Sequence, residues 1–128
     1  MKLGYHRDVE LSFEEAESRV RATLQEQGFG VLTEIDVKAT LKKKLDVDFR
    51  PYKILGACHP SSAFKALSIV AEIGLLLPCN VTVSLNDDGT VRVAAVDAEV
   101  MLGVVDRPDL ASVAADVSGW LRAAIDAV

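Results

Sequence analysis

The spacing of hydrophobic and polar residues changes several times along the chain, and each change predicts a new element. Alternation over residues 5–11 predicts a strand, and apolar residues three to four apart over residues 13–27 predict an amphipathic helix. Short apolar runs at 29–35 and 52–57 predict two more strands, and residues 37–45 between them predict a short helix. The first half of the chain therefore alternates strands with helices.

The second half begins with a predicted helix over residues 60–71, where Pro at the first helical position lacks an N–H that would have had no partner. Clean alternation over 79–85 and a strand pattern over 91–96, joined by the turn sequence NDDG, predict an antiparallel hairpin. A last helix starting near Pro108 has an unusually broad apolar stripe. The expected stripe of the 60–71 helix comprises Ala63, Ala66, Leu67 and Val70.

Capping residues mark several helix ends. Ser12 and Asp36 are expected to cap the first two helices, and Gly28 is expected to end the first. Asp97 predicts one helical turn after it, and Asp106 is the expected cap of the last helix.

Some burial expectations follow from the same patterns. In the short helix Val37, Leu41 and Leu45 are expected to face inward, with Lys42–Lys44 on its solvated end. Gly119, in the middle of the last helix, costs about 1 kcal/mol relative to Ala, so another backbone is expected to pack closely against it.

The element order allows two fold classes. Alternating strands and helices are compatible with a doubly wound parallel sheet, but amphipathic strands and a hairpin favour an α+β fold. We expect a two-layer sandwich, with a mostly antiparallel sheet of about five strands and helices on one face. The other face is expected to carry Thr33, Lys53, Asn80, Thr82, Ser84 and Arg92.

Composition narrows the class of protein. The 128 residues are half hydrophobic, which is enough for a single domain over residues 1–128 without disulfides. The net charge of −5 argues against nucleic acid as a partner. No signal-peptide pattern and no apolar run of about 20 residues is present, so a cytoplasmic protein with no membrane partner is expected.

Candidate chemistry gathers around the two cysteines. Cys58 and His59 fall at a strand-to-helix junction, where exposed backbone N–H groups favour anions. Cys79 and Asn80 begin the next strand. These four residues are the candidate ligand-binding site, and no catalytic set can be assigned. Whether the two thiols meet depends on whether the strands that carry them are parallel or antiparallel.

Other interpretations of the cysteines stay open. They could be two buried small hydrophobic residues, because free Cys is often buried. A metal site needs three or four ligands, and Cys58, His59 and Cys79 supply at most three. We therefore expect no metal and no cofactor.

The runs GFGVLTEIDVKATLKKKL, YKILGACHPSSAFKAL, IGLLLPCNVTV and DDGTVRVAAVDAEVMLG resemble the domain of unknown function 302 family, DUF302. Cys58 and Pro60 in GACHP, and Pro78 and Cys79 in LPC, match that family's motif, whereas His59 falls where asparagine is frequent. The resemblance implies a bacterial or archaeal single-domain α+β protein that forms a homodimer and has no established activity.

Two classes of function follow. The first is a dimeric binding or accessory module that holds a small ligand or anion at the Cys58 junction. The second is a thiol-dependent enzyme or redox sensor that uses Cys58 with Cys79. We predict the first, because no base, oxyanion pair or cofactor fingerprint is visible in the sequence.

Overall fold

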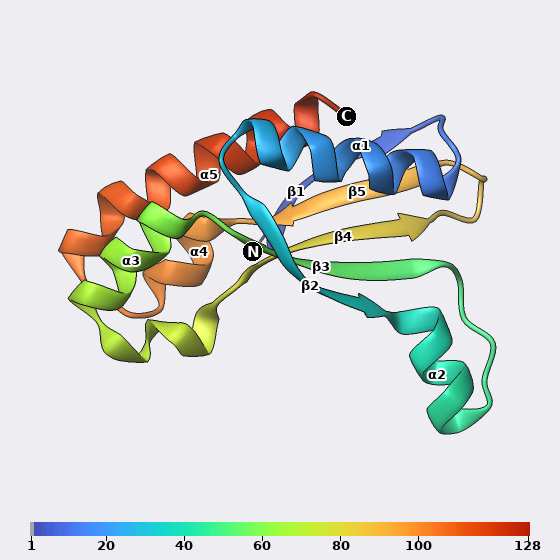
Figure 1. The fold of residues 1–128 in the computed structure, drawn as a ribbon, viewed down its shortest axis with the longest axis horizontal. Helices are drawn as coiled ribbons and strands as arrows, with labels where there is room; N and C mark the ends of the chain where they lie inside the picture. Colours follow the sequence, from blue (N-terminus) through green and yellow to red (C-terminus); the bar gives the residue numbers. More distant parts are fainter. Residues whose placement is uncertain (1) are drawn as a thin grey trace.

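Five strands form one sheet in the order β1-β5-β4-β3-β2, and every neighbouring pair is antiparallel (Figure 1). The structure is a computed structural model, and it describes residues 2–128. The strands are β1 (Gly4–Val9), β2 (Gly30–Asp36), β3 (Tyr52–Cys58), β4 (Cys79–Leu85) and β5 (Val91–Val96). The expected α+β class with a five-stranded antiparallel sheet is confirmed.

Two long helices cover one face of this sheet, and shorter helices gather at its two ends (Figure 1). None of the helices in residues 2–128 is long and apolar enough to cross a membrane. The α-helices are α1 (Phe13–Glu26), α2 (Val37–Leu45), α3 (Pro60–Ile69), α4 (Ala98–Gly103) and α5 (Ala111–Asp126). Two 3₁₀ helices are η1 (Ala71–Leu76) and η2 (Pro108–Leu110).

The direction of the strands decides where each connection lies. Because β3 and β4 are antiparallel neighbours, α3 and η1 leave the sheet and return to it at the same end. The same holds for α2 between β2 and β3, at the opposite end. Among the helical connections between strands, only α1 crosses from one edge of the sheet to the other, because it joins β1 to β2, the two edge strands.

The core lies between the sheet and the pair α1 and α5. The apolar stripe expected in the last helix is buried as far as Val128, and only Trp120 in it is partly exposed. Val91 and Val93 of β5 face this stripe, Val81 and Val83 of β4 face α1, and all four are fully buried. Each buried Leu, Ile or Val side chain contributes roughly 1.5–3 kcal/mol, so this interface dominates the stability of the fold.

Three of the expected N-caps are confirmed. Ser12 Oγ accepts the Glu15 N–H at 3.1 Å, and Asp36 accepts the Ala39 N–H at 2.9 Å. Asp97 accepts the N–H of Glu99 at 2.9 Å. These local bonds satisfy backbone donors that the first helical turn leaves free.

Two expectations about the last helix are wrong. Pro108 begins the 3₁₀ helix η2 instead of α5, so Asp106 lies too early to cap α5, and it adopts a left-handed φ of 55°. Gly119 is exposed, and a Cβ added there would meet nothing within 4 Å. Close backbone packing is therefore not the reason for that glycine.

The helix α2 also differs from its expected burial. None of its residues is buried, and the Leu45 side chain is 66 % exposed. The reason is topological, because α2 lies beyond the end of the sheet, where α1 and α5 do not reach (Figure 1). The stripe of α3 is likewise narrower than expected, since only Ser62 and Ala66 are buried and Leu67 is exposed.

Lys53 lies on the helix-covered face, not on the open face as expected. It stands opposite Val83 in the register, and its Nζ pairs with Glu17 of α1 at 2.9 Å. Glu17 also accepts a 3.0 Å hydrogen bond from Arg21, which itself pairs with Glu34 of β2. A hydrogen bond to Glu17 raises the pKa of Lys53, so the Lys53 ammonium group remains charged at neutral pH. The cluster ties α1 to β2 and β3.

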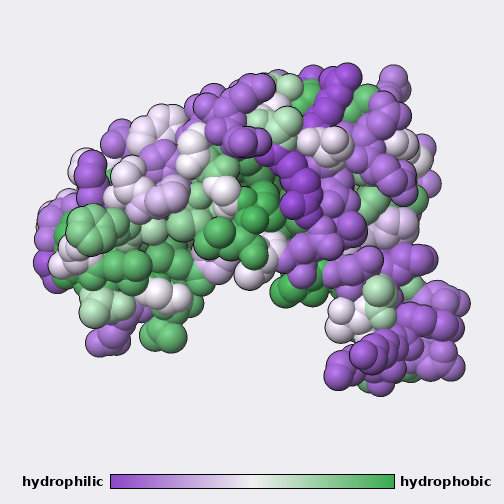
Figure 2. Space-filling model, viewed as in Figure 1, coloured by the Kyte–Doolittle hydropathy of each residue, from purple (hydrophilic) through white to green (hydrophobic). Residues whose placement is uncertain are grey.

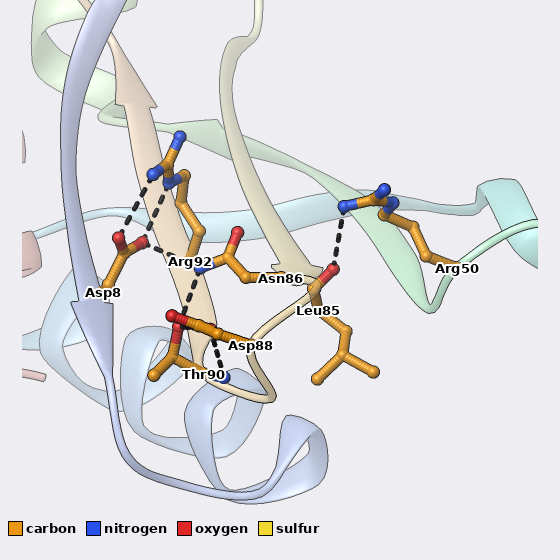
Figure 3. A network of polar contacts seen from close by, with 7 residues as sticks. All are labelled: Asp8, Arg50, Leu85, Asn86, Asp88, Thr90 and Arg92. Carbon is orange, nitrogen blue, oxygen red and sulfur yellow. Dashed lines mark hydrogen bonds and ion pairs between the residues drawn. The ribbon is translucent and has the colours of Figure 1, made fainter.

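A polar network fixes the β4–β5 hairpin to β1 (Figure 3). Arg92 donates two hydrogen bonds to the Asp8 carboxylate, at 2.8 and 3.1 Å. Asn86 donates to the same carboxylate at 3.1 Å, and within the turn Thr90 donates to Asp88. The hydrogen bonds from Arg92 lower the pKa of Asp8 to about 2.

Replacing Arg92 by Gln is expected to raise the pKa of Asp8 from about 2 towards the ordinary value of 3.8. Because the pKa is depressed in the folded state, the pair stabilises the fold above that ordinary value, and the stabilisation is lost as pH falls through about 2. An NMR titration of the Asp8 carboxyl carbon measures the shift. Arg50→Gln is the control, because Arg50 pairs with Asp87 and should leave Asp8 unchanged. An Asp8 titration that is the same in R92Q and wild type would contradict the assignment.

Candidate functional site

One end of the sheet collects the chain segments that carry the candidate residues. The register pairs Gly30 with Cys58 and Ala57 with Cys79, so β2 begins, β3 ends and β4 begins at this end. The helices α3 and α4 start here as well, and α5 lies across them (Figure 1). Residues far apart in sequence therefore share one site.

A cavity of about 310 Å³ opens at this end. We call it the Cys58 cavity. Its lining has five polar or thiol residues, Thr33, Cys58, His59, Ser62 and Cys79. The other twelve lining residues are apolar, and they come from every element around it, among them Phe29, Ala66, Leu77, Met101 and Val117.

Both cysteines line the cavity and come from adjacent strands, but the register directs their side chains to opposite faces of the sheet. Ala57 is the cross-strand partner of Cys79, and Cys58 is the residue that follows Ala57 on β3. This antiparallel pairing answers the question of topology that the sequence left open. Both cysteines are free thiols.

The environments of the two thiols differ. Cys58 is half-buried, whereas Cys79 is only 7 % exposed. Burial first, and then the electrostatic effect of the neighbouring Cys58, raise the pKa of Cys79 to about 11. Cys79 is thus protonated at neutral pH and is a poor nucleophile, so any thiol chemistry here starts at Cys58.

His59 is held tightly at the start of α3. Its Nδ1 lies 2.9 Å from the Ser62 hydroxyl, in the first turn of the helix. Its ring stacks on Trp120 with centroids 4.4 Å apart, and Phe29 meets it edge-on at 5.2 Å. These contacts fix the imidazole as part of the cavity wall.

Gly28 makes room for that imidazole. Its φ of 88° is in the left-handed region, where it ends α1, and a Cβ at this position would lie 2.9 Å from His59 Nε2. The C-terminal end of α1 therefore packs directly against the start of α3.

Asn80 is the one candidate residue that the structure places apart. It lies opposite Gly56, is exposed, and is not in the lining of the cavity. Cys58, His59 and Cys79 do share the cavity, but within residues 2–128 no three His, Cys, Asp or Glu side chains come together as metal ligands.

Sequence reasoning missed several residues of the site, notably Phe29, Ser62 and Trp120. One local signal was available, because Ser62 stands three residues after the N-cap His59 and can reach it. Phe29 and Trp120 had no such signal, since their contacts depend on how α1 and α5 pack at this end. Met101 and Leu102 of α4 also line the cavity.

The lining of the cavity suits a small apolar ligand better than an anion. No Lys or Arg is among its lining residues, so it offers no cation to neutralise a buried anion. Its apolar wall can desolvate a small apolar molecule, while Cys58, Ser62 and Thr33 offer a few weak polar contacts.

Comparison with known proteins bears out the sequence resemblance. The family model for "Domain of unknown function DUF302" matches residues 5–128. The crystal structure of an uncharacterized conserved protein DUF302 from Bacillus stearothermophilus is similar to this chain, with a TM-score of 0.91 and 31 % sequence identity over 98 % of both chains. No curated protein matches the sequence.

Replacing Gly28 by Ala is expected to destabilise the protein by roughly 2 kcal/mol or more, because backbone strain adds to a clash with His59. Thermal or chemical unfolding measures this loss. Displacement of His59 should also change the fluorescence of Trp120, the single tryptophan.

Gly89→Ala is the matched control. Gly89 has nearly the same φ, 89°, but a Cβ there meets nothing within 4 Å, so only the strain of about 1 kcal/mol should remain. Equal losses in the two variants, with unchanged Trp120 fluorescence in G28A, would show that the contact with His59 is unimportant.

Proposed function

The chain belongs to the family described as "Domain of unknown function DUF302", and from that premise we propose that it binds a neutral, largely apolar small molecule in the Cys58 cavity. The family description assigns no activity. The proposal is supported by one observation, a cavity of about 310 Å³ whose wall is mostly apolar and whose few polar groups lie near its thiols.

The size of the cavity suits a small ligand. Ligand pockets in proteins range from about 300 to 1,000 Å³, so this cavity is at the lower end of the range. Burial of apolar ligand surface contributes roughly 25 cal/mol per Å², and an apolar wall provides that surface.

The lining favours a neutral ligand over the anion that the helix start first suggested. A buried anion needs a cation or several donors, and the lining contains no Lys or Arg. The Ser62 hydroxyl, which could have served as a donor, already lies against His59 Nδ1. The backbone N–H groups at the start of α3 would be the only strong attraction for an anion.

Thiol chemistry is the second candidate function, and the presence of two free cysteines in the lining of one cavity favours it. Cys58 is the more accessible of the two thiols, whereas Cys79 is buried and protonated at neutral pH. The register offsets the two cysteines by one residue and so directs their side chains to opposite faces of the sheet, which counts against a direct disulfide between them. No side chain within residues 2–128 hydrogen-bonds to Cys58 and could act as its general base, so we rank this candidate second.

Binding can be tested with two fluorescent probes that differ by one sulfonate group. N-phenyl-1-naphthylamine is neutral, and 1-anilinonaphthalene-8-sulfonate is its anionic counterpart. We expect saturable binding of one neutral probe per chain, and at least about tenfold weaker binding of the anion. Cys58→Ser should keep the binding of the neutral probe within about twofold, because the proposal assigns that thiol no covalent step.

A cavity-filling variant and a matched control locate the bound probe. Ala63 lines the cavity, so Ala63→Phe is expected to weaken the neutral probe by about tenfold or more. Ala115→Phe makes the same change at an exposed position of α5 outside the lining and should have no effect. Absence of saturable binding to wild type, or equal binding by A63F and A115F, would overturn the proposal.

A further inference from the structure

The Cys58 cavity has an exposed side and a buried side. Leu32 of β2 is 70 % exposed and Leu67 of α3 is 41 % exposed, and both belong to its lining. At the other extreme, Leu102 of α4 and Val117 of α5 are each only 5 % exposed. We call the side with Leu32 and Leu67 the mouth, and the side with Leu102 and Val117 the floor. The cavity therefore opens between β2 and α3 and closes against α4 and α5.

An irregularity in β2 shapes the mouth. Val31 stands opposite Ala57, the cross-strand partner expected in a regular ladder. Thr33 stands opposite Gly56, the residue before Ala57, so Leu32 is an extra residue with no partner on β3. In a regular strand the side chains of Leu32 and Thr33 would point to opposite faces, and only one could face the cavity. The bulge allows both to line it, as β-bulges beside functional sites often do.

The polar group at the mouth is the Thr33 hydroxyl. A Cβ on Gly56 would clash with Thr33 Oγ1 and with the Pro78 ring. The missing side chain of Gly56 therefore lets the Thr33 hydroxyl reach across β3 to Pro78, which also lines the cavity. Because Thr33 is exposed, this hydroxyl can donate a hydrogen bond to a ligand at the mouth or accept one from it.

The other polar side chains of the lining are less available to a ligand. His59 Nδ1 and the Ser62 hydroxyl are 2.9 Å apart and bond to each other. Cys58 and Cys79 are thiols, which are weak donors and weak acceptors. The floor is aliphatic. The cavity is thus polar at its mouth and apolar at its floor, and this gradient fits a molecule with one polar and one apolar end.

The volume of the cavity limits the length of that molecule. An engineered apolar cavity of about 150 Å³ holds one benzene molecule, which has about six non-hydrogen atoms. The Cys58 cavity, at about 310 Å³, has twice that volume and so has room for roughly twelve non-hydrogen atoms. An alkyl chain of about ten carbons with one small polar end therefore fits.

Apolar surface also covers the lobe beside the mouth. Figure 2 shows much of the lobe formed by α3 and η1 in green, the colour of hydrophobic residues. Phe64 of α3 and Leu75 of η1 are both exposed there. Lys65 and Glu72 are the only charged residues between positions 54 and 86. The approach to the mouth therefore suits an uncharged aliphatic molecule better than an ion.

We propose that the ligand of the Cys58 cavity is a neutral aliphatic amphiphile, an alkyl chain of about ten carbons with one hydrogen-bonding end. The chain lies against the floor, and its polar end stays at the mouth, where the Thr33 hydroxyl binds it. This inference rests on the proposed function, which requires only a neutral apolar ligand, and it adds the class of that ligand and its orientation.

A series of 1-alkanols tests the class of ligand. Each alkanol competes with N-phenyl-1-naphthylamine, and the loss of probe fluorescence gives the affinity of the alkanol. We expect the affinity to rise about fourfold with each added CH₂ from 1-hexanol to about 1-decanol, and to level off once the cavity is full. Alkanols that do not displace the probe, or that displace it equally at every chain length, would contradict the inference.

Thr33→Val tests the polar contact at the mouth. Val has nearly the same shape as Thr and a high strand propensity but cannot form the hydrogen bond, so 1-decanol should bind about three- to tenfold more weakly. Thr82→Val is the matched control, because Thr82 lies in β4 opposite Ile54 and outside the lining, and it should leave this affinity unchanged. Equal affinities for 1-decanol in T33V and T82V would remove Thr33 from the site and overturn the orientation proposed for the ligand.

The two proposals fail in different ways. A wild-type protein that does not bind N-phenyl-1-naphthylamine contradicts both the proposed function and this inference. A wild-type protein that binds the probe, with weaker binding in A63F, but that fails the alkanol test contradicts only the class of ligand inferred here.

Discussion

The antiparallel pairing of β3 with β4 is the constraint on which the site depends. Because these neighbours run in opposite directions, the α3–η1 connection begins and ends at the same end of the sheet. Cys58 and Cys79, which are 21 positions apart in the sequence, become neighbours for this reason alone. A parallel arrangement would have put them at opposite ends, and no shared cavity would exist.

The two faces of the sheet are used differently. Burial of the α1 and α5 stripes against one face supplies most of the hydrophobic stabilisation, and the Lys53 ion pairs adjust how α1 lies on it. The other face contributes little to the stability of a single chain, so its residues are free to serve binding. The Cys58 cavity lies at one end of the sheet, and α2 projects from the other end.

Local chemistry made much of the fold predictable, and long-range packing accounts for the errors. The caps at Ser12, Asp36 and Asp97 were predictable because their bonds reach only two or three residues. Lys53 was assigned to the wrong face because its alternation fits either face until the partner Glu17 is known. Leu45 was expected to be buried, since the pattern gives the apolar face of a helix but not whether anything covers it. The site was half predictable: the junction at Cys58 could be located, but the contacts of Phe29 and Trp120 with His59 depend on how α1 and α5 pack at this end.

Xenon bound in crystals under pressure is the most direct measurement of the central claim, that this end of the sheet holds an apolar cavity beside two thiols. Xenon enters dry, apolar cavities and does not compete for polar sites. The account predicts xenon density in contact with Cys79 and Met101, inside the wall formed by α3 and α5. Ordered water filling the same space, with no xenon, would contradict it.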